Sequence, residues 1–462
     1  MNSKSVLDEH AQPGPVQALA PKLRHLRWVI LSLIAVCVVS AAWWSTQRNV
    51  ASNATAAPGH LRWGPSLAST WRVQFDPTLP ASQISLLPNG SSAESMVEQV
   101  YALLRQGERS SALLQTQRLV TNFPNFQLGQ LLYAELLNEG LAQPIDPKEI
   151  PGKETASGQD RYDELLLESN RRLNRPAVNT LKGLVPSNII SLSPQNPYLI
   201  AVDTSKSRLY WFANKTVDPL KPQLELLLDT YVSVGQKGTG KLREGDGRTP
   251  LGVYFVNKNL KGQPLPDLYG AGALTLNYPN AIDVMRGQTG SGIWLHGTPS
   301  TQYARAPWAT DGCVVMSNPE MDQLLRLKNV EKTPVLITDK LEWVSSERSV
   351  PDRDAFQKTL NQWIRDRQTA NINSLKSLYS PNYQRDGKDL SAWWPDIAAA
   401  VQVKGQGGPV NLHSVLHWKD TQDYIVVNVT NPNTPKGKAP QQLRMYWAKE
   451  GNQWQVLYEG PV

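Results

Sequence analysis

Cysteine is almost absent from this chain of 462 residues, which contains only two cysteines, Cys37 and Cys313. Cys37 lies in an uncharged apolar segment and Cys313 in a loop-rich stretch far from it, so we expect no disulfide between them. The chain therefore has no disulfide framework. Neither the cysteines nor the 6 histidines form a cluster with the spacing of metal ligands, so we expect no metal ion and no cofactor.

The chain also lacks a concentrated cationic segment. The 47 lysines and arginines against 40 acidic residues give a net charge of +7 and a pI near 9.2, and the basic residues are spread along the chain. A nucleic-acid groove needs basic residues interleaved with aromatic ones, and no such run occurs. We therefore expect no nucleic-acid partner and favour an anionic surface such as a membrane or cell wall.

The length of the chain predicts several domains, because a single ordinary domain is much shorter. A hydrophobic content of 40% allows real cores, and 34 prolines and 31 glycines indicate many turns and linkers. The pattern divides the chain into a cytoplasmic tail (1–27), a transmembrane anchor (28–44), a linker (45–90), a helical region (91–185), a β-rich domain (197–340) and a C-terminal α+β domain (351–462).

The predicted anchor carries no charge from Trp28 to Trp44, which is near the lower limit for a membrane-spanning helix. Tryptophan at both ends suits the membrane interface, and the basic flank is N-terminal. We therefore expect the tail in the cytoplasm and the bulk of the chain in the periplasm. A cleavable signal peptide is the alternative, since Ser40–Ala42 offers small residues, but the long tail and the Trp43–Trp44 pair favour an uncleaved inner-membrane anchor.

Two segments have the character of accessory modules. Residues 92–140 show helical spacing that resembles a tetratricopeptide helix pair, which favours either a small helical cap or a partner-binding surface. Residues 351–462 show helices followed by alternating strands, an order that resembles the cone-shaped nuclear transport factor-like fold. His413 and His417 lie on one of these strands without metal-ligand partners, so we interpret them as surface or packing residues.

The most informative stretch is Ile293–Asn318. An apolar run ends at His296, a loop of small and polar residues follows, and the loop closes on a glycine and Cys313. A histidine near a thiol can act as its base, and backbone N–H groups around a Gly-Cys turn can stabilise an oxyanion. The alternative is a structural cysteine beside a core histidine. In an exported chain, a lone thiol is better explained by chemistry than by packing.

A glycine-rich stretch before this site has the spacing of a phosphate-binding loop over Gly235–Lys241. Leu242 stands where that loop needs a serine or threonine for magnesium, and no helical pattern follows, so we exclude nucleotide binding. The turn that comes next presents Arg248 and Thr249 ahead of an apolar strand.

Residues 197–340 contain the motifs G-D-G-R-T-P-L-G-V-Y, G-S-G-I-W-L-H-G and T-D-G-C-V-V-M-S-N. In these motifs and in their order, the segment resembles the L,D-transpeptidase catalytic domain of the YkuD type. The loop between the histidine and the T-D-G-C motif is slightly shorter than is usual. The resemblance implies a β-rich fold and acyl transfer in the bacterial envelope, serving peptidoglycan biosynthesis, cell-wall organisation and cell shape.

The resemblance also implies roles for individual residues. Cys313 is the expected nucleophile, His296 the general acid and base, and the backbone of Gly312 an oxyanion donor. The expected substrate-binding residues are Arg248, Thr249, Gly297, Thr310 and Asp311. Trp294 is expected either to line the donor groove or to pack in the core. The implied donor is the tetrapeptide stem of peptidoglycan, and an outer-membrane lipoprotein or another envelope protein is a further implied partner.

Two positions depart from the family pattern. Asp311 stands where many members have histidine, and Val315 stands where many have arginine or asparagine. These changes leave the usual cross-linking specificity open. The reaction expected first is transfer from the stem peptide to an amine acceptor. A hydrolase that releases D-Ala or lipoprotein, and a non-catalytic envelope scaffold, are the alternatives.

Overall fold

The computed structural model describes residues 92–138, 158–174, 178–347, 351–402, 410–430 and 442–462. The predicted tail, transmembrane anchor and linker lie outside these residues. Within the part that is described, no helix combines the length and apolar character needed to cross a membrane.

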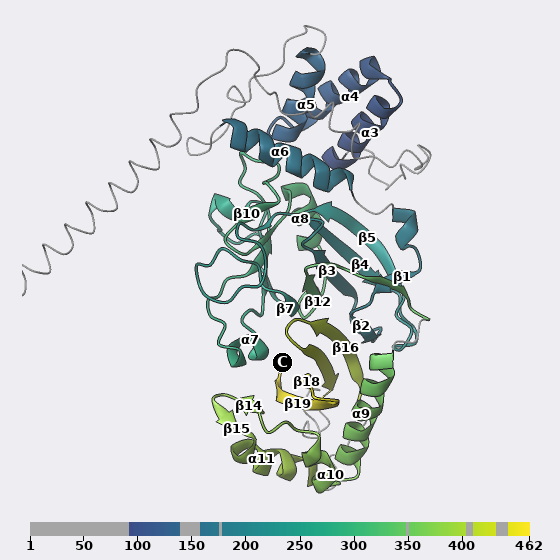
Figure 1. Cartoon of the computed structure of the whole chain (residues 1–462), viewed down its shortest axis with the longest axis vertical. Coiled ribbons are helices and arrows are strands. Elements are labelled where there is room, and N and C mark those ends of the chain that lie inside the picture. Colours follow the sequence, from purple (N-terminus) through teal and green to yellow (C-terminus); the bar gives the residue numbers. More distant parts are fainter. Residues whose placement is uncertain (1–91, 139–157, 175–177, 348–350, 403–409, 431–441) are drawn as a thin grey trace, which may run out of the picture. The chain divides into compact units, whose positions relative to one another are not determined.

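The N-terminal described part is a group of four α-helices around one apolar core (Figure 1). The helices are α3 (Ala93–Arg105), α4 (Arg109–Asn122), α5 (Gln127–Asn138) and α6 (Gly158–Leu173). Ser92 caps α3, because its hydroxyl accepts a hydrogen bond from the N–H of Ser95 at 3.2 Å. The helical spacing read in the sequence for residues 92–140 therefore corresponds to α3, α4 and α5.

The middle of the chain forms an eight-stranded mixed sheet in the order β11-β9-β8-β7-β12-β3-β4-β5. Its strands are β3 (Tyr198–Asp203), β4 (Arg208–Asn214), β5 (Leu224–Tyr231), β7 (Gly252–Asn259), β8 (Ala273–Leu276), β9 (Trp294–His296), β11 (Val314–Val315) and β12 (Pro334–Thr338). Strand β12 is parallel to β3 and antiparallel to β7. Alternate residues of β3 enter two different cores, Ile200 on one face and Leu199 on the other, so the strand is buried on both faces.

Short elements complete this domain. They are η3 (Val178–Leu181), β1 (Leu184–Pro186), β6 (Val234–Gly235), η4 (Asp267–Tyr269), α7 (Ala281–Met285), β10 (Trp308–Thr310), α8 (Asn318–Leu325) and β13 (Trp343–Ser345). Strand β10 pairs in parallel with β6, and β1 pairs antiparallel with β13. The loops that flank the catalytic motifs are thus tied to the strands of the domain.

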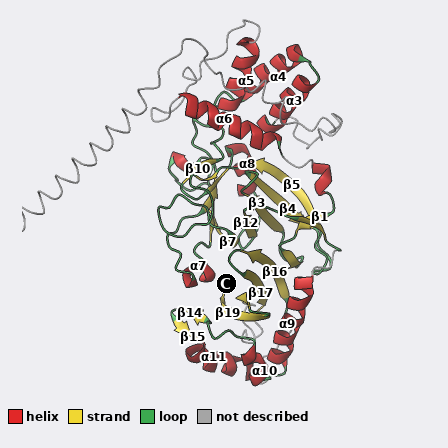
Figure 2. Cartoon of the chain, viewed as in Figure 1, coloured by secondary structure: helices red, strands yellow, loops and turns green. Residues whose placement is uncertain are grey.

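The C-terminal part has helices first and a curved antiparallel sheet after them, as the sequence predicts (Figure 2). Its elements are α9 (Pro351–Gln368), α10 (Ile372–Ser377), β14 (Gln384–Arg385), β15 (Lys388–Asp389), α11 (Leu390–Gln402), β16 (Leu412–Lys419), β17 (Asp423–Thr430), β18 (Gln442–Glu450) and β19 (Gln453–Pro461). The residue pattern alone did not predict α11 or the β14–β15 hairpin. His413 contacts Thr430 and His417 contacts Asp423, each at 2.9 Å.

The boundary drawn at residue 197 does not separate the folded units. Strand β2 (Ile189–Leu192) precedes it, yet it pairs with β16 and completes the C-terminal sheet. The apolar core also crosses this boundary, because Leu199 of the central sheet and Leu416 of the C-terminal sheet belong to one apolar cluster. A four-residue strand is too short to reveal its sheet partner by periodicity.

The helical region is joined to the central sheet by buried charges. Arg208 of β4 is 0% exposed and is hydrogen-bonded through Nε to Asp229 of β5 at 2.7 Å and through Nη1 to Glu94 of α3. Glu94 also pairs with Arg172 of α6 at 3.2 Å, and Arg172 pairs with Glu168 at 2.8 Å. Each carboxylate is stable without water only while its cation stays in place.

We expect Arg208→Ala to lower the free energy of unfolding by about 3–5 kcal/mol, because it leaves buried carboxylates without their cation. Lys215→Ala is the control. Its partner is Glu225 and both side chains are more than half exposed, so the loss should be about 0–1 kcal/mol. Urea unfolding of the two variants measures the difference. Equal losses would contradict a role for the buried pairs.

Candidate active site

The register of two short parallel strands brings the two candidate catalytic residues to one face of the sheet. Strand β11 pairs with β9 so that Val314 lies opposite Leu295 and Val315 opposite His296. Leu295 and Val314 both enter the core below the sheet. Because side chains alternate along a strand, His296, Val315 and the preceding Cys313 face the other way. Cys313, which directly precedes β11, is partly exposed.

The turn before Cys313 requires a glycine. Gly312 has φ +129°, and a Cβ atom there would lie 2.6 Å from the carbonyl oxygen of Arg248. The hydroxyl of Thr249 donates to the carbonyl of Gly312 at 3.0 Å, and the hydroxyl of Thr310 donates to the carbonyl of Cys313 at 2.7 Å. Two threonine hydroxyls therefore hold the Gly312–Cys313 turn, one at the carbonyl of each residue.

Three residues predicted to bind substrate instead support this turn or the histidine. Thr249 is fully buried, and its hydroxyl also accepts from the N–H of Gly235 at 2.8 Å. Thr310 is buried too, and its hydroxyl also accepts from the N–H of Gly312 at 3.1 Å. Gly297 is packed so closely that a Cβ would lie 2.1 Å from Oδ1 of Asn318. Their polar groups are already engaged within the protein.

The oxyanion role predicted for Gly312 needs a correction for the same reason. Its N–H donates to the hydroxyl of Thr310, so it serves the turn rather than pointing to a substrate. The N–H of Cys313 is the remaining candidate of the pair named from the sequence.

His296 is arranged to act as a base. Its Nδ1 lies 2.7 Å from the carbonyl oxygen of Gly297, and a carbonyl can only accept, so Nδ1 carries the proton and Nε2 has a free lone pair. The ring of Tyr269 packs edge-on against it at 5.1 Å. Burial lowers the pKa of His296 to about 4, and the charge of Arg305 adds to this effect. The imidazole is therefore neutral at pH 7.

The thiol of Cys313 is protonated at rest. Its Sγ donates to the carbonyl oxygen of Gly292 at 3.3 Å. Desolvation raises the pKa of Cys313 above its ordinary value, and the carboxylate of Asp311 raises it further. A backbone hydrogen bond from Trp294 and the positive charges of Arg305 and Lys241 lower the same pKa. The site thus pairs a neutral thiol with a neutral base.

The other predicted residues lie at the surface around the thiol. Arg248 is exposed, and its Nη1 donates to the carbonyl of Thr239 at 2.9 Å. Asp311 is exposed as well, and its Oδ1 accepts from the side chain of Gln236 at 2.9 Å. Trp294 is half-buried and packs on Tyr269, with ring centroids 4.8 Å apart.

Three residues of the site were missed in the sequence. Tyr269 packs against His296, and Lys241 and Arg305 act electrostatically on Cys313. Lys241 was noticed only as part of a rejected phosphate loop. Arg305 is the one charged residue in the loop between His296 and Thr310, and this position between the two motifs could have identified it as a residue of the site.

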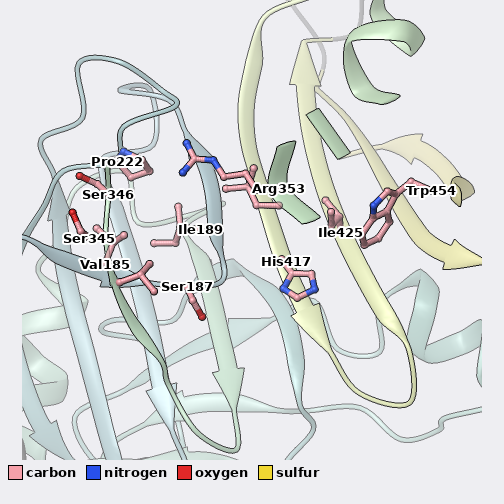
Figure 3. Close-up of a pocket in the computed structure, with 12 residues that line it drawn as sticks. Val185, Ser187, Ile189, Pro222, Ser345, Ser346, Arg353, His417, Ile425 and Trp454 are labelled. Atoms are coloured by element: carbon pink, nitrogen blue, oxygen red, sulfur yellow. The ribbon is translucent and has the colours of Figure 1, made fainter. Parts of the chain in front are cut away.

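A pocket of about 90 Å³ lies elsewhere in the molecule (Figure 3). Its walls include Ile189 from β2, Val344 from β13, and His417 and Trp454 from the C-terminal sheet. No residue of the catalytic motifs lines it, so we do not assign it to the active site. Among the residues that the structure describes, no group of three or more His, Cys, Asp or Glu side chains has the arrangement of a metal site.

We expect alkylation of Cys313 by iodoacetamide to reach half its maximal rate at a pH above about 8.5, the ordinary thiol value. Asp311→Asn should lower this midpoint, because it removes a negative charge that disfavours the thiolate. Glu342→Gln, an exposed change on another loop, is the control. Peptide mass analysis distinguishes Cys313 from Cys37. A midpoint at or below pH 7 in the unchanged protein would indicate a thiolate–imidazolium pair instead.

We expect Gly312→Ala to lower turnover about 100-fold, because the methyl group displaces the thiol from its place. Gly287→Ala is the matched control, since Gly287 also has a positive φ but no atom within 4 Å of the added carbon. It should cost about 1 kcal/mol of stability and little activity. Steady-state rates of the two variants decide the question. Wild-type turnover in Gly312→Ala would show that the turn is not critical.

Comparison with known proteins supports the identification of this domain. The family model of the L,D-transpeptidase catalytic domain (YkuD) matches residues 197–337. Among curated proteins, the chain is similar to one named "Putative L,D-transpeptidase YafK", from Escherichia coli (strain K12), with 29% identity over 117 residues. That match covers 22% of this chain and 43% of YafK, so the chain spans less than half the length of this relative.

Two solved structures are also similar. Bd1075 of Bdellovibrio bacteriovorus has 23% sequence identity and a TM-score of 0.49, over 60% of this chain and 98% of that one. The helical cell shape determining protein Pgp2 of Campylobacter jejuni has 18% identity and a TM-score of 0.46, over 59% of this chain and 96% of that one. On the family match and its motifs, residues 197–337 form an L,D-transpeptidase catalytic domain of the YkuD type.

Proposed function

We propose that this protein is a peptidoglycan L,D-transpeptidase that uses Cys313 to transfer an acyl group from a tetrapeptide stem to an amine acceptor. The observation that carries the proposal is the register of β9 and β11, in which Val315 lies opposite His296. Because side chains alternate, Cys313, two residues before Val315, is expected on the same face as His296. This arrangement occurs within the segment that matches the family of L,D-transpeptidase catalytic domains.

In the proposed reaction, Nε2 of neutral His296 takes the proton of the Cys313 thiol as sulfur attacks the carbonyl carbon of the third stem residue. The N–H of Cys313 stabilises the oxyanion, an interaction worth about 3–4 kcal/mol at comparable sites. The bond to the terminal D-Ala then breaks, and His296 returns the proton to its amine. A thioester on Cys313 remains.

An amine acceptor resolves the thioester by attack on its carbonyl, giving up a proton to His296 and releasing the thiol. The low pKa of His296 is consistent with this cycle, because the imidazole is charged only while it holds the transferred proton. The positive charges of Arg305 and Lys241 favour the transient thiolate.

The location of this reaction is part of the proposal. The uncharged segment 28–44 would anchor the chain in the inner membrane, with the catalytic domain in the periplasm where peptidoglycan lies. An outer-membrane lipoprotein or another envelope protein is the further partner that we propose as an acceptor.

Hydrolysis of the thioester by water is the second candidate, which would make the enzyme an L,D-carboxypeptidase or amidase. The observation that favours it is the pair of departures from the family pattern. Val315 is 2% exposed and apolar where many members carry a polar side chain, and the Asp311 carboxylate is exposed beside the thiol. A polar side chain that the family uses near the donor peptide is therefore lacking.

The test is to incubate the full-length protein with purified tetrapeptide muropeptides and to measure the D-Ala released. We expect release by the unchanged protein, none by Cys313→Ala, and full release by Cys37→Ala, the change at the other thiol. A covalent adduct of a carbapenem with Cys313, seen by intact mass, should form in parallel. Absence of both D-Ala and adduct would overturn the proposal.

Products made with and without an added amine distinguish the two candidates. A transpeptidase forms the amide of the acceptor and releases little free tripeptide. A hydrolase forms tripeptide at the same rate whether or not the amine is present.

A further inference from the structure

The loop between the two candidate catalytic residues is held from outside the catalytic domain. Tyr303, near its middle, is 5% exposed and belongs to the apolar core of the helical region. Its N–H donates to the carbonyl of Asn125 at 3.1 Å. The side chain of Asn125 in turn donates to the carbonyl of Ser300 at 3.2 Å. Asn125 lies in the turn Asn122–Phe126, which joins α4 to α5.

The aromatic side chains of the same turn contact the Tyr303 ring. The ring of Phe123 meets it edge-on at 5.2 Å and that of Phe126 lies tilted at 4.8 Å. Such pairs contribute about 0.5–1.5 kcal/mol each beyond the area that they bury. On the far side, the hydroxyl of Tyr303 donates to Glu320 of α8 at 3.3 Å. The loop is therefore fixed between the helical region and the catalytic domain.

A second contact acts two residues further along the loop. The hydroxyl of Tyr231 donates to the carbonyl of Arg305 at 2.8 Å. The guanidinium of Arg172 in α6 lies 4.1 Å from the centre of the Tyr231 ring. Arg172 is itself held by Glu94 and Glu168 of the helical region. Two sets of contacts thus connect this region to Tyr303 and Arg305, and Arg172 joins them, because its guanidinium also lies 5.1 Å from the centre of the Phe126 ring.

The loop segment held by these contacts includes Arg305, whose positive charge acts on both Cys313 and His296. The guanidinium of Arg305 bonds the carbonyl of Ala309 at 3.3 Å, and its charge lowers the pKa of both Cys313 and His296. The energy of such an interaction varies inversely with distance, so a small displacement of the loop changes both groups. Bond-making chemistry is equally sensitive to position, since a shift of about 1 Å can cost about 100-fold in rate.

We propose that the turn Asn122–Phe126 is a positioning element of the active site, which holds Tyr303 and thereby sets the distance of Arg305 from Cys313. The proposal deepens the proposed function and rests on it, because it assigns the helical region a part in turnover. The helical region is then more than a cap or a partner-binding surface. Anything that moves the α4–α5 turn changes the reactivity of the thiol.

The test compares two sets of substitutions in the full-length protein. Phe123→Ala combined with Asn125→Ala removes the ring contact with Tyr303 and the side-chain hydrogen bond to Ser300. Both side chains are half-buried and lie outside the catalytic domain. Val100→Ala is the control, because Val100 is fully buried in the same helical core and lies on α3 rather than in the turn Asn122–Phe126. Tyr303→Phe is the conservative variant, which keeps the ring contacts and removes only the hydroxyl.

For the double variant we expect kcat to fall about tenfold or more, with KM changed less than about threefold, because positioning acts on the chemical step. The midpoint pH of Cys313 alkylation should rise, as the cation moves away. Arg305→Gln should raise the same midpoint and Arg305→Lys should not. Val100→Ala should lower the melting temperature without moving kcat or the midpoint. Tyr303→Phe should lower kcat less than the double variant does, because it keeps both ring contacts and loses only the hydrogen bond to Glu320.

The proposal is overturned if the double variant changes kcat and the alkylation midpoint no more than Val100→Ala does. Alkylation needs no substrate, so this outcome is separate from failure of the proposed function. If the unchanged protein releases no D-Ala, the midpoint shift alone decides whether the turn positions the thiol.

Discussion

The parallel pairing of β9 with β11 is the constraint on which the site depends. Neither strand is longer than three residues, and β11 is an edge strand, so their ladder alone is weak. The pairing persists because alternate side chains enter the core of the central sheet and because the N–H of Val315 donates to Ser233 at 2.9 Å. A slip of one residue would turn Cys313 and His296 into the core and the apolar residues out to solvent. Burial of the apolar face therefore determines on which side of the sheet Cys313 and His296 lie.

Electrostatics in the site follow from the same burial. A histidine that is 3% exposed prefers its neutral form, and a partly desolvated thiol prefers to keep its proton. Two neutral partners cost less to hold in a poorly hydrated place than an ion pair would. In the proposed reaction, charge appears only when the proton moves, and Arg305 and Lys241 then favour the thiolate while Asp311 opposes it. The departure of Asp311 from the family pattern thus acts on the thiol itself.

The domains named from the sequence share their cores in the folded chain. One apolar cluster contains residues of the central sheet together with Leu416 and Trp418 of the C-terminal sheet. Another contains the helical region together with Tyr303 of the catalytic loop. Shared cores make the accessory regions mechanically continuous with the loop that joins His296 to Cys313. The arrangement supplies the physical route on which the proposed positioning of the catalytic loop by the helical region rests.

The sequence by itself determined the family of the catalytic domain and predicted the order of helices and strands. Both were readable because they depend on local patterns. A histidine at the end of an apolar run and a cysteine after a glycine predicted the pair, and the family match confirmed the β-rich catalytic domain. Helical and alternating spacing predicted the helices before the C-terminal strands. These features need no knowledge of distant contacts.

Tertiary structure alone decided the rest. Thr249 and Thr310 carry hydroxyls that suit a substrate, and only the fold shows that both are engaged in holding the Gly312–Cys313 turn. Strand β2 joins a sheet whose other strands lie at the far end of the chain. Asn125 and Ser300, 175 positions apart, meet at the catalytic loop. Such contacts arise from long-range packing, which leaves no periodic trace in a single sequence.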